Sequence, residues 1–291
     1  MTPGRRSGPS TTNPATSRNT TSVPERLNTT PAYERTRASS LGTMQQRLPS
    51  MMENPVAFAH RGACAHAPEN TLEAFALALR LGANGIETDA WVTADGAVVL
   101  DHDGSVRRRG RRTAIAAVER TALPAHIPTV ADLFDACGTR FHLSVDVKDP
   151  AALTGILRTC SEAGFPLENL WLCHDNFSVV ETWAQTRVPA RIVDSSRLQR
   201  IKEGPERRIA RLAEIGASAL NMHQTDWTGG LAALAHRFGV LAFGWDAQQD
   251  HRLSEMFRMG LDGVYSDHVD RIVAAYRTEI GGVPPLPVAG S

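Results

Sequence analysis

Residues 56–89, VAFAHRGACAHAPENTLEAFALALRLGANGIETD, contain the pattern that decides the fold. The short apolar run Val56–Ala59 is followed by the amphipathic stretch Thr71–Leu81, whose apolar residues recur at helical spacing. A second apolar run, Gly85–Asp89, comes next and reads as a buried strand. This order predicts a strand, a crossover helix and a parallel strand.

The same unit recurs along the rest of the chain and gives eight strand–helix pairs. The strand-like runs are Val56–Ala59, Gly85–Asp89, His142–Val147, Leu170–Cys173, Arg191–Asp194, Ser218–Asn221, Val240–Phe243 and Gly263–Tyr265. Eight units favour a closed parallel barrel over an open doubly wound sheet, which normally uses fewer. We therefore predict an α/β fold, a (β/α)8 TIM barrel, with a short insertion, residues 104–127, after the second strand.

The ends of the chain differ in composition from this body. Residues 1–50 carry seven Arg and two Glu, whereas the remainder holds 24 basic and 29 acidic side chains. A Ser-, Thr- and Arg-rich segment without hydrophobic periodicity buries too little apolar surface to order itself. We predict a disordered basic tail over 1–52, the barrel over 53–280 and a flexible C-terminus over 281–291.

Composition also excludes several classes of protein. The 31 basic and 31 acidic residues balance, so no overall charge points to nucleic acid as a partner. No run reaches the roughly 18–20 apolar residues of a transmembrane helix. The four cysteines, Cys64, Cys137, Cys160 and Cys173, include no C-x-x-C pair and indicate neither a disulfide framework nor a zinc cluster. A cytoplasmic location is the default expectation, and the oligomeric state is left open.

Polar residues gather where the predicted strands end. In a parallel barrel all these ends face one mouth, where such folds carry their chemistry. A buried strand has no structural need for charge, so the pattern predicts an active site. The residues concerned are His60, Arg61, Glu87, Asp89, Asp146, Lys148, His174, Asp175, Asp194, Asn221, His223, Trp245 and Asp246.

Three of the carboxylates suggest a metal site. Glu87 and Asp89 are two residues apart on a strand, so their side chains share a face, and Asp146 ends the next strand. Three convergent oxygen donors suit a hard divalent ion, Mg²⁺ or Ca²⁺. The alternative is that one carboxylate accepts a loop amide and the other pairs with Arg61 or Lys148.

Two histidines and one lysine complete the pattern. His60 ends the first strand and His102 follows the run 97–100, so both are expected at the mouth, where imidazoles can serve as acid and base. Lys148 is one of only two lysines among 31 basic residues. Its place at a strand end indicates that a compact positive charge is required there.

Several ordered blocks resemble the glycerophosphodiester phosphodiesterases. They are Phe58–Gly62, Pro68–Thr71, Gly82–Asp89, Val92–Gly96, Val99–Asp103, Ile127–Thr129, Asp146–Lys148, Trp245–Gln248 and Gly260–Asp267. The resemblance covers about residues 54–277 and implies a barrel that hydrolyses glycerophosphodiesters to glycerol 3-phosphate and an alcohol, in glycerol and lipid metabolism. It implies one divalent cation, Mg²⁺ or Ca²⁺. The implied roles are metal ligation by Glu87, Asp89 and Asp146, acid–base catalysis by His60 and His102, and substrate binding by Arg61, Glu69, Lys148 and Trp245.

The chain departs from the family pattern at a few positions. Asp146 stands where a Glu is usual, Gln248 where an Asn is usual, and His268 where a Pro is common. A related activity of the phospholipase D type, on lysophospholipid or sphingolipid diesters, is an alternative. A catalytically impaired barrel that only binds phosphodiesters is another, because Asp146 is one methylene shorter than Glu.

The predicted insertion contains a run of basic residues, Arg107–Arg112 around Gly110. Such a run is most often a solvated surface. The functional alternative is that this run lies near the mouth and attracts anionic head groups or makes a peripheral contact with a membrane surface.

Overall fold

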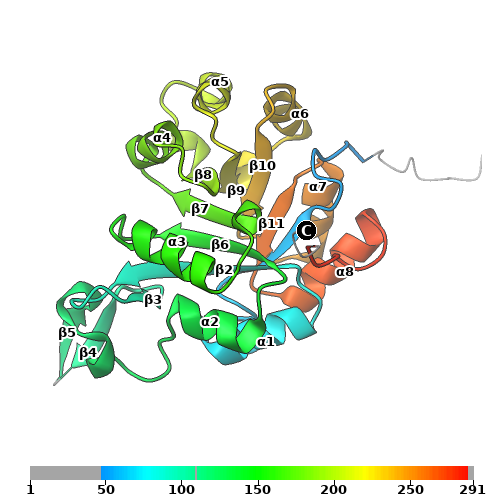
Figure 1. The fold of residues 1–291 in the computed structure, drawn as a ribbon. Coiled ribbons are helices and arrows are strands. Elements are labelled where there is room, and N and C mark those ends of the chain that lie inside the picture. The colour runs from blue at the N-terminus through cyan, green and yellow to red at the C-terminus, as the bar shows by residue number, and fades with distance from the viewer. Residues whose placement is uncertain (1–46, 109, 288–291) are drawn as a thin grey trace, which may run out of the picture. The chain divides into compact units, whose positions relative to one another are not determined.

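The computed structural model describes residues 47–108 and 110–287, and in them eight parallel strands close into a barrel (Figure 1). The strand order is β1, β2, β6, β7, β8, β9, β10 and β11, with β1 paired to both β2 and β11. The strands are β1 Val56–Ala59, β2 Gly85–Val92, β6 His142–Val147, β7 Leu170–His174, β8 Arg191–Ser196, β9 Ala219–His223, β10 Leu241–Trp245 and β11 Gly263–Ser266. The eight predicted runs are these eight strands, and the predicted TIM barrel is confirmed.

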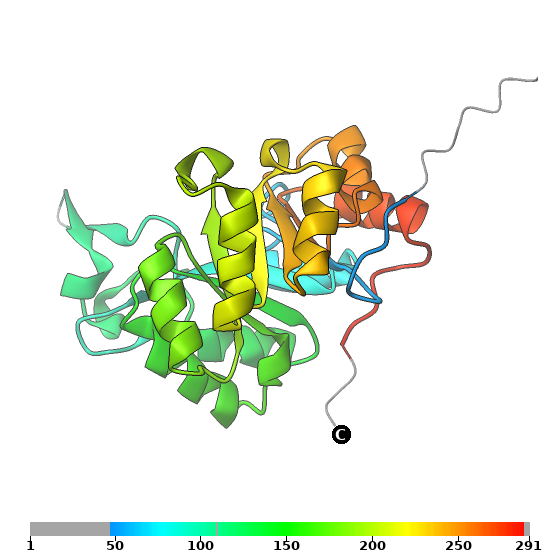
Figure 2. The same cartoon turned by 90° about the horizontal axis from the view of Figure 1, so that it is seen from above.

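A helix follows each barrel strand and lies outside it (Figure 2). The helices are α1 Leu72–Arg80, α2 Val130–Cys137, α3 Ala152–Glu162, α4 Phe177–Gln185, α5 Pro205–Ile215, α6 Gly229–Arg237, α7 Asp250–Arg258 and α8 Val269–Glu279. Local sequence signals set several starts: the Thr71 and Thr228 side chains cap α1 and α6, and Thr129 forms a capping box with Asp132 at α2. Among the described helices none has the length and apolar character needed to cross a bilayer.

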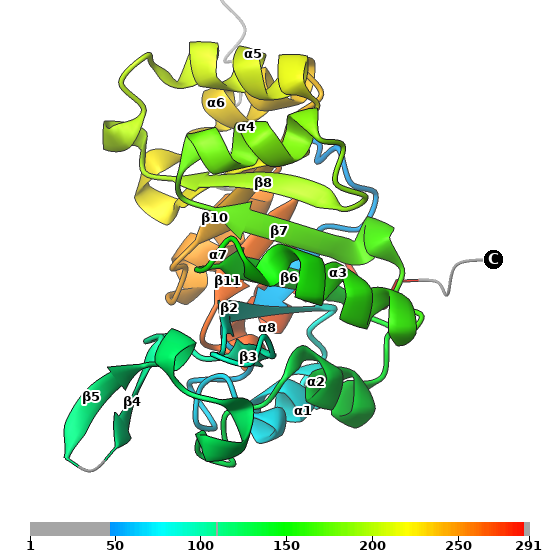
Figure 3. The ribbon, with the colours of Figure 1, turned by 60° about the vertical axis from the view of Figure 1, so that its left-hand side comes forward.

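The insertion interrupts the alternation of strand and helix after the second strand, as predicted. Beyond β2 the chain adds an antiparallel strand, β3 Val98–Leu100, which pairs with the outer end of β2. A hairpin of β4 Ser105–Arg108 and β5 Arg111–Ala114 then projects from the barrel (Figure 3). The described arginines of the hairpin are exposed, and Arg112 pairs with Asp103 at 3.3 Å. Its attraction to anionic surfaces stays a prediction.

Aromatic residues fill the barrel below its mouth. Phe58, Trp171, Phe243 and Tyr265 are buried and form one cluster, in which the Phe58 and Tyr265 rings stack with centroids 4.5 Å apart. A larger apolar cluster fills the space between the strands and the surrounding helices. The interior is therefore a packed core, which leaves the strand ends as the place for a cavity.

Parts of two segments predicted to be flexible contact the barrel. Residues 1–46 of the predicted tail and 288–291 of the predicted flexible C-terminus lie outside the described residues. Residues 47–52, which we call the strap, run along the barrel because the buried carboxylate of Asp262 accepts hydrogen bonds from Ser50, Met51 and Met52. At the other end the Pro285 carbonyl accepts a bond from Asn84, so 281–287 also contacts the barrel.

Candidate active site

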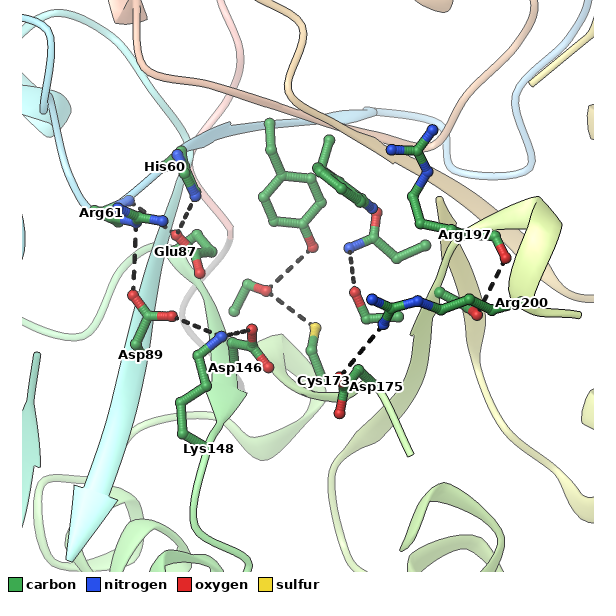
Figure 4. Close-up of a pocket in the computed structure, with 16 residues that line it drawn as sticks. His60, Arg61, Glu87, Asp89, Asp146, Lys148, Cys173, Asp175, Arg197 and Arg200 are labelled. Carbon is green, nitrogen blue, oxygen red and sulfur yellow. Dashed lines mark hydrogen bonds and ion pairs between the residues drawn. The ribbon is translucent and has the colours of Figure 1, made fainter. Parts of the chain in front are cut away.

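The mouth of the barrel holds a cavity of about 280 Å³. Sixteen residues from the strand ends and the loops after them line it: His60, Arg61, Glu87, Asp89, Ser144, Asp146, Lys148, Cys173, Asp175, Ser195, Ser196, Arg197, Arg200, Asn221, Trp245 and Tyr265 (Figure 4). Seven of the nine residues proposed from the sequence are in this lining. The expectation that polar strand ends meet at one mouth holds for them.

A tight turn after β1 aims two of these residues at the cavity. Gly62 has φ +77°, and a Cβ there would meet the Ala74 backbone of α1 at 2.7 Å, so only glycine fits. Arg61 itself adopts a left-handed φ of 52°, a strained conformation that recurs at functional sites. The turn lets the Arg61 N–H donate to Glu87 Oε2 at 2.9 Å.

Glu87 and Asp89 lie side by side on β2 and are both nearly fully buried. Asn70 Nδ2 donates to Asp89 Oδ2 at 3.1 Å, and Thr88 Oγ1 donates to Asn70 Oδ1 at 2.6 Å. These bonds fix the direction of the Asp89 carboxylate. Asn70 belongs to a block that resembled the family, but neither its spacing nor its type revealed that it would orient Asp89.

Lys148 bridges the carboxylates of Asp89 and Asp146. Its ammonium pairs with Asp89 Oδ1 at 3.2 Å and bonds to Asp146 Oδ2. Burial opposes its charge, but Asp146 and Asp89 outweigh burial and raise the pKa of Lys148. The need for a compact cation at this strand end therefore has a direct structural reason, two acids on neighbouring strands.

The sequence left open an alternative to a metal site, in which one carboxylate accepts a loop amide and the other pairs with Arg61 or Lys148. These contacts are all present. Glu87 accepts a loop amide, and Asp89 faces both Arg61, at 3.7 Å, and Lys148. They leave Glu87 under-compensated: burial first, and then the charges of Asp89 and Asp146, raise its pKa to about 7 although His60 and the Arg61 amide oppose this. A buried carboxylate at that value is one that a cation would strongly stabilise.

His60 is oriented by a residue from the other end of the chain. Its Nδ1 contacts Asp267 Oδ1 at 2.6 Å, and its Nε2 lies 3.8 Å from Glu87 Oε2. Burial lowers the pKa of His60, but Glu87 and Asp267 outweigh it and raise that pKa well above 6.5. Burial alone would raise the pKa of Asp267, but the hydrogen bond from His60 outweighs burial and lowers that pKa to about 2. No role was predicted for Asp267, although it ends a block that resembles the family.

Two of the predicted site residues are not in the cavity lining. Glu69 stands behind it and accepts a bond from Arg61 Nη1 at 2.8 Å. His102, beyond β3, is exposed and its Nδ1 contacts Asp103 at 3.1 Å. The neighbouring residue, Asp101, donates its N–H to the Asp89 carbonyl, which anchors this loop beside the mouth. The catalytic role of His102 stays a prediction.

The wall across the cavity from His60 contains two arginines that sequence reasoning did not single out (Figure 4). Arg197 pairs with Asp226 at 2.8 Å and lies over the Trp245 ring, and Arg200 lies 3.8 Å from Asp175. Arg197 precedes and Arg200 ends the short 3-10 helix Leu198–Arg200 that follows β8, so no strand-end position marked them. Asp194, predicted at the mouth, instead turns toward α5 and pairs with Arg208 at 2.7 Å.

The carboxylates of the mouth fit a hard divalent cation. Among the described residues, Glu87 Oε1 and Asp146 Oδ1 have no hydrogen-bond partner, and burial raises the pKa of Glu87. The donors are all oxygens, as Mg²⁺ and Ca²⁺ prefer. In the described part of the chain, two groups of three residues have ligand atoms that all lie within 4.8 Å of one another: His60–Cys64–Asp267 and His66–His268–Asp270. The three carboxylates of the mouth are not among these groups.

Comparison with known proteins agrees with this geometry. The sequence model described as the glycerophosphoryl diester phosphodiesterase family matches residues 60–148, which include His60, Glu87, Asp89, Asp146 and Lys148. A glycerophosphodiester phosphodiesterase of Caldanaerobacter subterraneus subsp. tengcongensis is 24% identical over 252 residues, 75% of this chain and 96% of that protein. A probable glycerophosphodiester phosphodiesterase 1 of Mycobacterium tuberculosis is 49% identical over 55 residues, 19% of this chain and 20% of that protein.

Solved structures share the fold. A crystal structure of a putative glycerophosphoryl diester phosphodiesterase from Silicibacter pomeroyi has a TM-score of 0.69 and 20% identity, over 81% of this chain and 96% of that one. A phosphodiesterase of Oleispira antarctica, solved with its product sn-glycerol-3-phosphate, has a TM-score of 0.62 and 20% identity, over 76% and 96% of the two chains. Fold, motif order and sequence match agree: the chain is similar to the glycerophosphoryl diester phosphodiesterase family, whose model matches residues 60–148.

Proposed function

We propose that the protein is a metal-dependent phosphodiesterase that hydrolyses glycerophosphodiesters to glycerol 3-phosphate and an alcohol. The observation that carries the proposal is the cavity itself, where buried Glu87 and Asp89 face Arg61, Lys148 and an oriented His60. The product sn-glycerol-3-phosphate in the Oleispira phosphodiesterase supports the same substrate class.

Charge neutralisation is the first requirement, because a phosphodiester anion repels nucleophiles. We assign Glu87, Asp89 and Asp146 as ligands of one Mg²⁺ or Ca²⁺, which when bound supplies positive charge to the phosphoryl oxygens. Asp146 is shorter than Glu and is held by Lys148, so it is expected to be the weakest of the three ligands. Arg61 and Lys148 add the fixed positive charge of the protein at the same wall.

Proton transfer is the second requirement. Asp267 occupies Nδ1 of His60, so Nε2 is the nitrogen left to exchange a proton with the substrate. We assign His60 as the base that accepts the proton of the glycerol 2-hydroxyl, which attacks phosphorus and gives a cyclic phosphate that water then opens. Glu87 is the largest of the charges that raise the pKa of His60, and a cation held by Glu87 would offset that charge and let His60 be neutral before it accepts the proton. His102 would protonate the leaving alcohol from the loop beside Asp89.

The cavity favours small polar substrates over lipids. Its volume of about 280 Å³ and its lining of mostly charged and polar side chains suit a deacylated glycerophosphodiester. Trp245 is an apolar wall of the cavity, with Arg197 over its ring. We therefore place lysophospholipids and sphingolipid diesters second.

A substrate panel with defined metals tests the proposal. Glycerophosphocholine, glycerophosphoethanolamine, glycerophosphoglycerol and lysophosphatidylcholine are incubated with Mg²⁺, Ca²⁺ or chelator, and glycerol 3-phosphate is measured. We expect turnover of the deacylated substrates that the chelator abolishes, and loss of about 2–4 orders of magnitude in kcat for His60→Ala. His251→Ala, which changes an exposed histidine on α7, is the matched control. Substrate binding without turnover at any metal would instead support an impaired barrel, and chelator-resistant turnover would contradict the metal assignment.

A further inference from the structure

Three different donor atoms meet on the outer side of His60. One imidazole nitrogen of His60, the Cys64 sulfur and an Asp267 oxygen all lie within 4.8 Å of one another. Nδ1 is the nitrogen that already contacts Asp267. The turn after β1 supplies two of the residues and the end of β11 the third, and the Ala65 N–H bonded to the Asp267 carbonyl at 3.3 Å holds the two segments together.

The chemistry of this group differs from that of the carboxylate site. Nitrogen, sulfur and oxygen donors suit Zn²⁺, whereas a thiolate is a poor ligand for Mg²⁺ or Ca²⁺. All three residues are half-buried, so an ion can enter from solvent and keep a water as its fourth ligand. Three protein ligands and one open position are a usual arrangement around zinc.

The distances require only small adjustments. Zinc with ligand bonds of about 2.0–2.3 Å holds its tetrahedral ligands about 3.3–3.6 Å apart. The 2.6 Å separation of His60 Nδ1 and Asp267 Oδ1 would have to open by about 1 Å. The Cys64 sulfur lies within 4.8 Å of the other two ligand atoms, so it would have to move in by no more than about 1.5 Å. Cys64 lies in a loop, where shifts of this size are readily accommodated.

We propose that His60, Cys64 and Asp267 form a second, thiophilic metal site that binds Zn²⁺ and inhibits the enzyme. Zinc at Nδ1 would replace the hydrogen bond that Nδ1 makes to Asp267. A neutral imidazole bound to zinc through Nδ1 carries its hydrogen on Nε2, so His60 could no longer accept the proton of the substrate there. The inhibition rests on the proposed function, whereas the binding itself does not.

The site is expected to bind zinc more tightly as pH rises. Metal binding must release the proton of the Cys64 thiol, so each bound ion exchanges with that proton. Burial, the largest influence, raises the pKa of Cys64 above its ordinary value, so the thiol is protonated at neutral pH. A protonated thiol is also slow to react with oxidants, which favours a metal site over a redox switch here.

A neighbouring group is the main competitor for the same ion. His66 Nε2 contacts Asp270 Oδ1 at 3.0 Å, and the His66 and His268 rings lie 6.3 Å apart. This group is more exposed and offers two nitrogens and an oxygen but no sulfur. The carboxylate ligands offer no sulfur either, but Cys173 also lines their cavity. The site that contains Cys64 is therefore identified by a metal–thiolate signature that is lost when Cys64 is replaced.

The experiment uses the full-length protein saturated with Mg²⁺. Co²⁺ is added as a probe and the thiolate-to-cobalt charge-transfer absorption is recorded, which needs no turnover. Zn²⁺ is then titrated in a glycerophosphodiesterase assay and by calorimetry. The variants are Cys64→Ser and Cys64→Ala, with His66→Ala/His268→Ala and Cys137→Ser as controls, and a melting curve for each checks that it is folded.

We expect the absorption band in the wild type and in both controls, and its loss in both Cys64 variants. The Zn²⁺ concentration for half-inhibition should rise about tenfold to a hundredfold in the Cys64 variants, with activity in Mg²⁺ alone retained. A band or a zinc sensitivity that persists without the Cys64 sulfur would overturn the proposal, as would loss of zinc binding only in His66→Ala/His268→Ala. If no substrate is turned over, the cobalt band still decides whether the site exists, and only the proposed function fails.

Discussion

The carboxylate of Asp262 offers a sharp test of what holds the strap against the barrel at the end opposite the mouth. It is fully buried at the start of β11 and satisfies five donors. Its Oδ1 accepts from the strap and its Oδ2 from the barrel: Ser50 Oγ at 2.6 Å, Met51 N at 2.7 Å, Met52 N at 2.9 Å, His236 Nε2 at 2.8 Å and Ala242 N at 2.9 Å. The perturbation is Asp262→Asn, which keeps the shape but turns one acceptor into a donor.

The expected cost follows from the number of donors left without an acceptor. If the amide oxygen of the new Asn faces Ala242, its NH₂ group faces two backbone N–H groups and a hydroxyl of the strap. Each buried donor left unpaired costs about 1–3 kcal/mol, and the strap donors regain part of this from water because Met51 is 45% exposed. We expect a loss of about 2–4 kcal/mol in the free energy of unfolding, and a melting temperature lower by about 5–15 °C.

Urea denaturation at neutral pH measures the free energy, and hydrogen exchange of the Met51 and Met52 amides shows whether the strap is released. Ser50→Ala is the matched control, because it removes one donor and leaves the acceptor intact, and it should cost about 1 kcal/mol or less. Activity per folded molecule should not change, because Asp262 lies at the far end of its strand from the cavity. A loss below about 0.5 kcal/mol for Asp262→Asn, or strap amides that stay protected, would refute the reasoning.

The pH dependence gives a second check on the same carboxylate. Burial alone would raise the pKa of Asp262, but the bonds from His236 and Ser50 outweigh it and lower that pKa. A carboxyl with a lowered folded-state pKa contributes stability that is complete above its unfolded pKa of about 3.9 and is lost as pH falls through the folded value. The stability difference between wild type and Asp262→Asn should therefore shrink below about pH 4.

Three further predictions concern other parts of the barrel. Burial lowers the pKa of half-buried His142 to about 4. The contribution of neutral His142 to the free energy of unfolding should therefore be complete above pH about 6.5 and fall by about 1–2 kcal/mol toward pH 4. Urea titrations should show no such fall in His142→Gln. Gly62→Ala should cost about 1–3 kcal/mol and lower kcat/KM, since its Cβ would meet the Ala74 backbone at 2.7 Å; unchanged melting and kinetics would contradict this. Arg208→Met should cost about 3–5 kcal/mol by leaving buried Asp194 unpaired, and Asp194→Asn/Arg208→Met should recover part of it.

The strands of the barrel were predictable because burial on both faces leaves a strong apolar signal. An amphipathic stretch of helical period follows each of the eight runs, directly or, after β2, beyond the insertion. The antiparallel strand β3 was read only as a run before His102, because three residues carry no periodicity that separates a strand from a loop. The order of residues 47–52 was missed for another reason: it depends on Asp262, about 210 positions away, and not on the apolar content of the segment itself.

The same distinction explains the site. Glu87 and Asp89 were predictable together because two residues on one strand share a face whatever the rest of the chain does. Asp267 was not, because its contact with His60 joins positions 207 apart and exists only because β11 pairs with β1 to close the barrel. The arginines after β8 reach the cavity through a loop, whose path no periodicity records. Closure also brings Cys64 beside Asp267, although the spacing of the cysteines gave no hint of a metal site. Ligands that come from the two ends of the chain are therefore invisible to motif spacing, and the thiophilic site is a property of the closed barrel rather than of any local pattern.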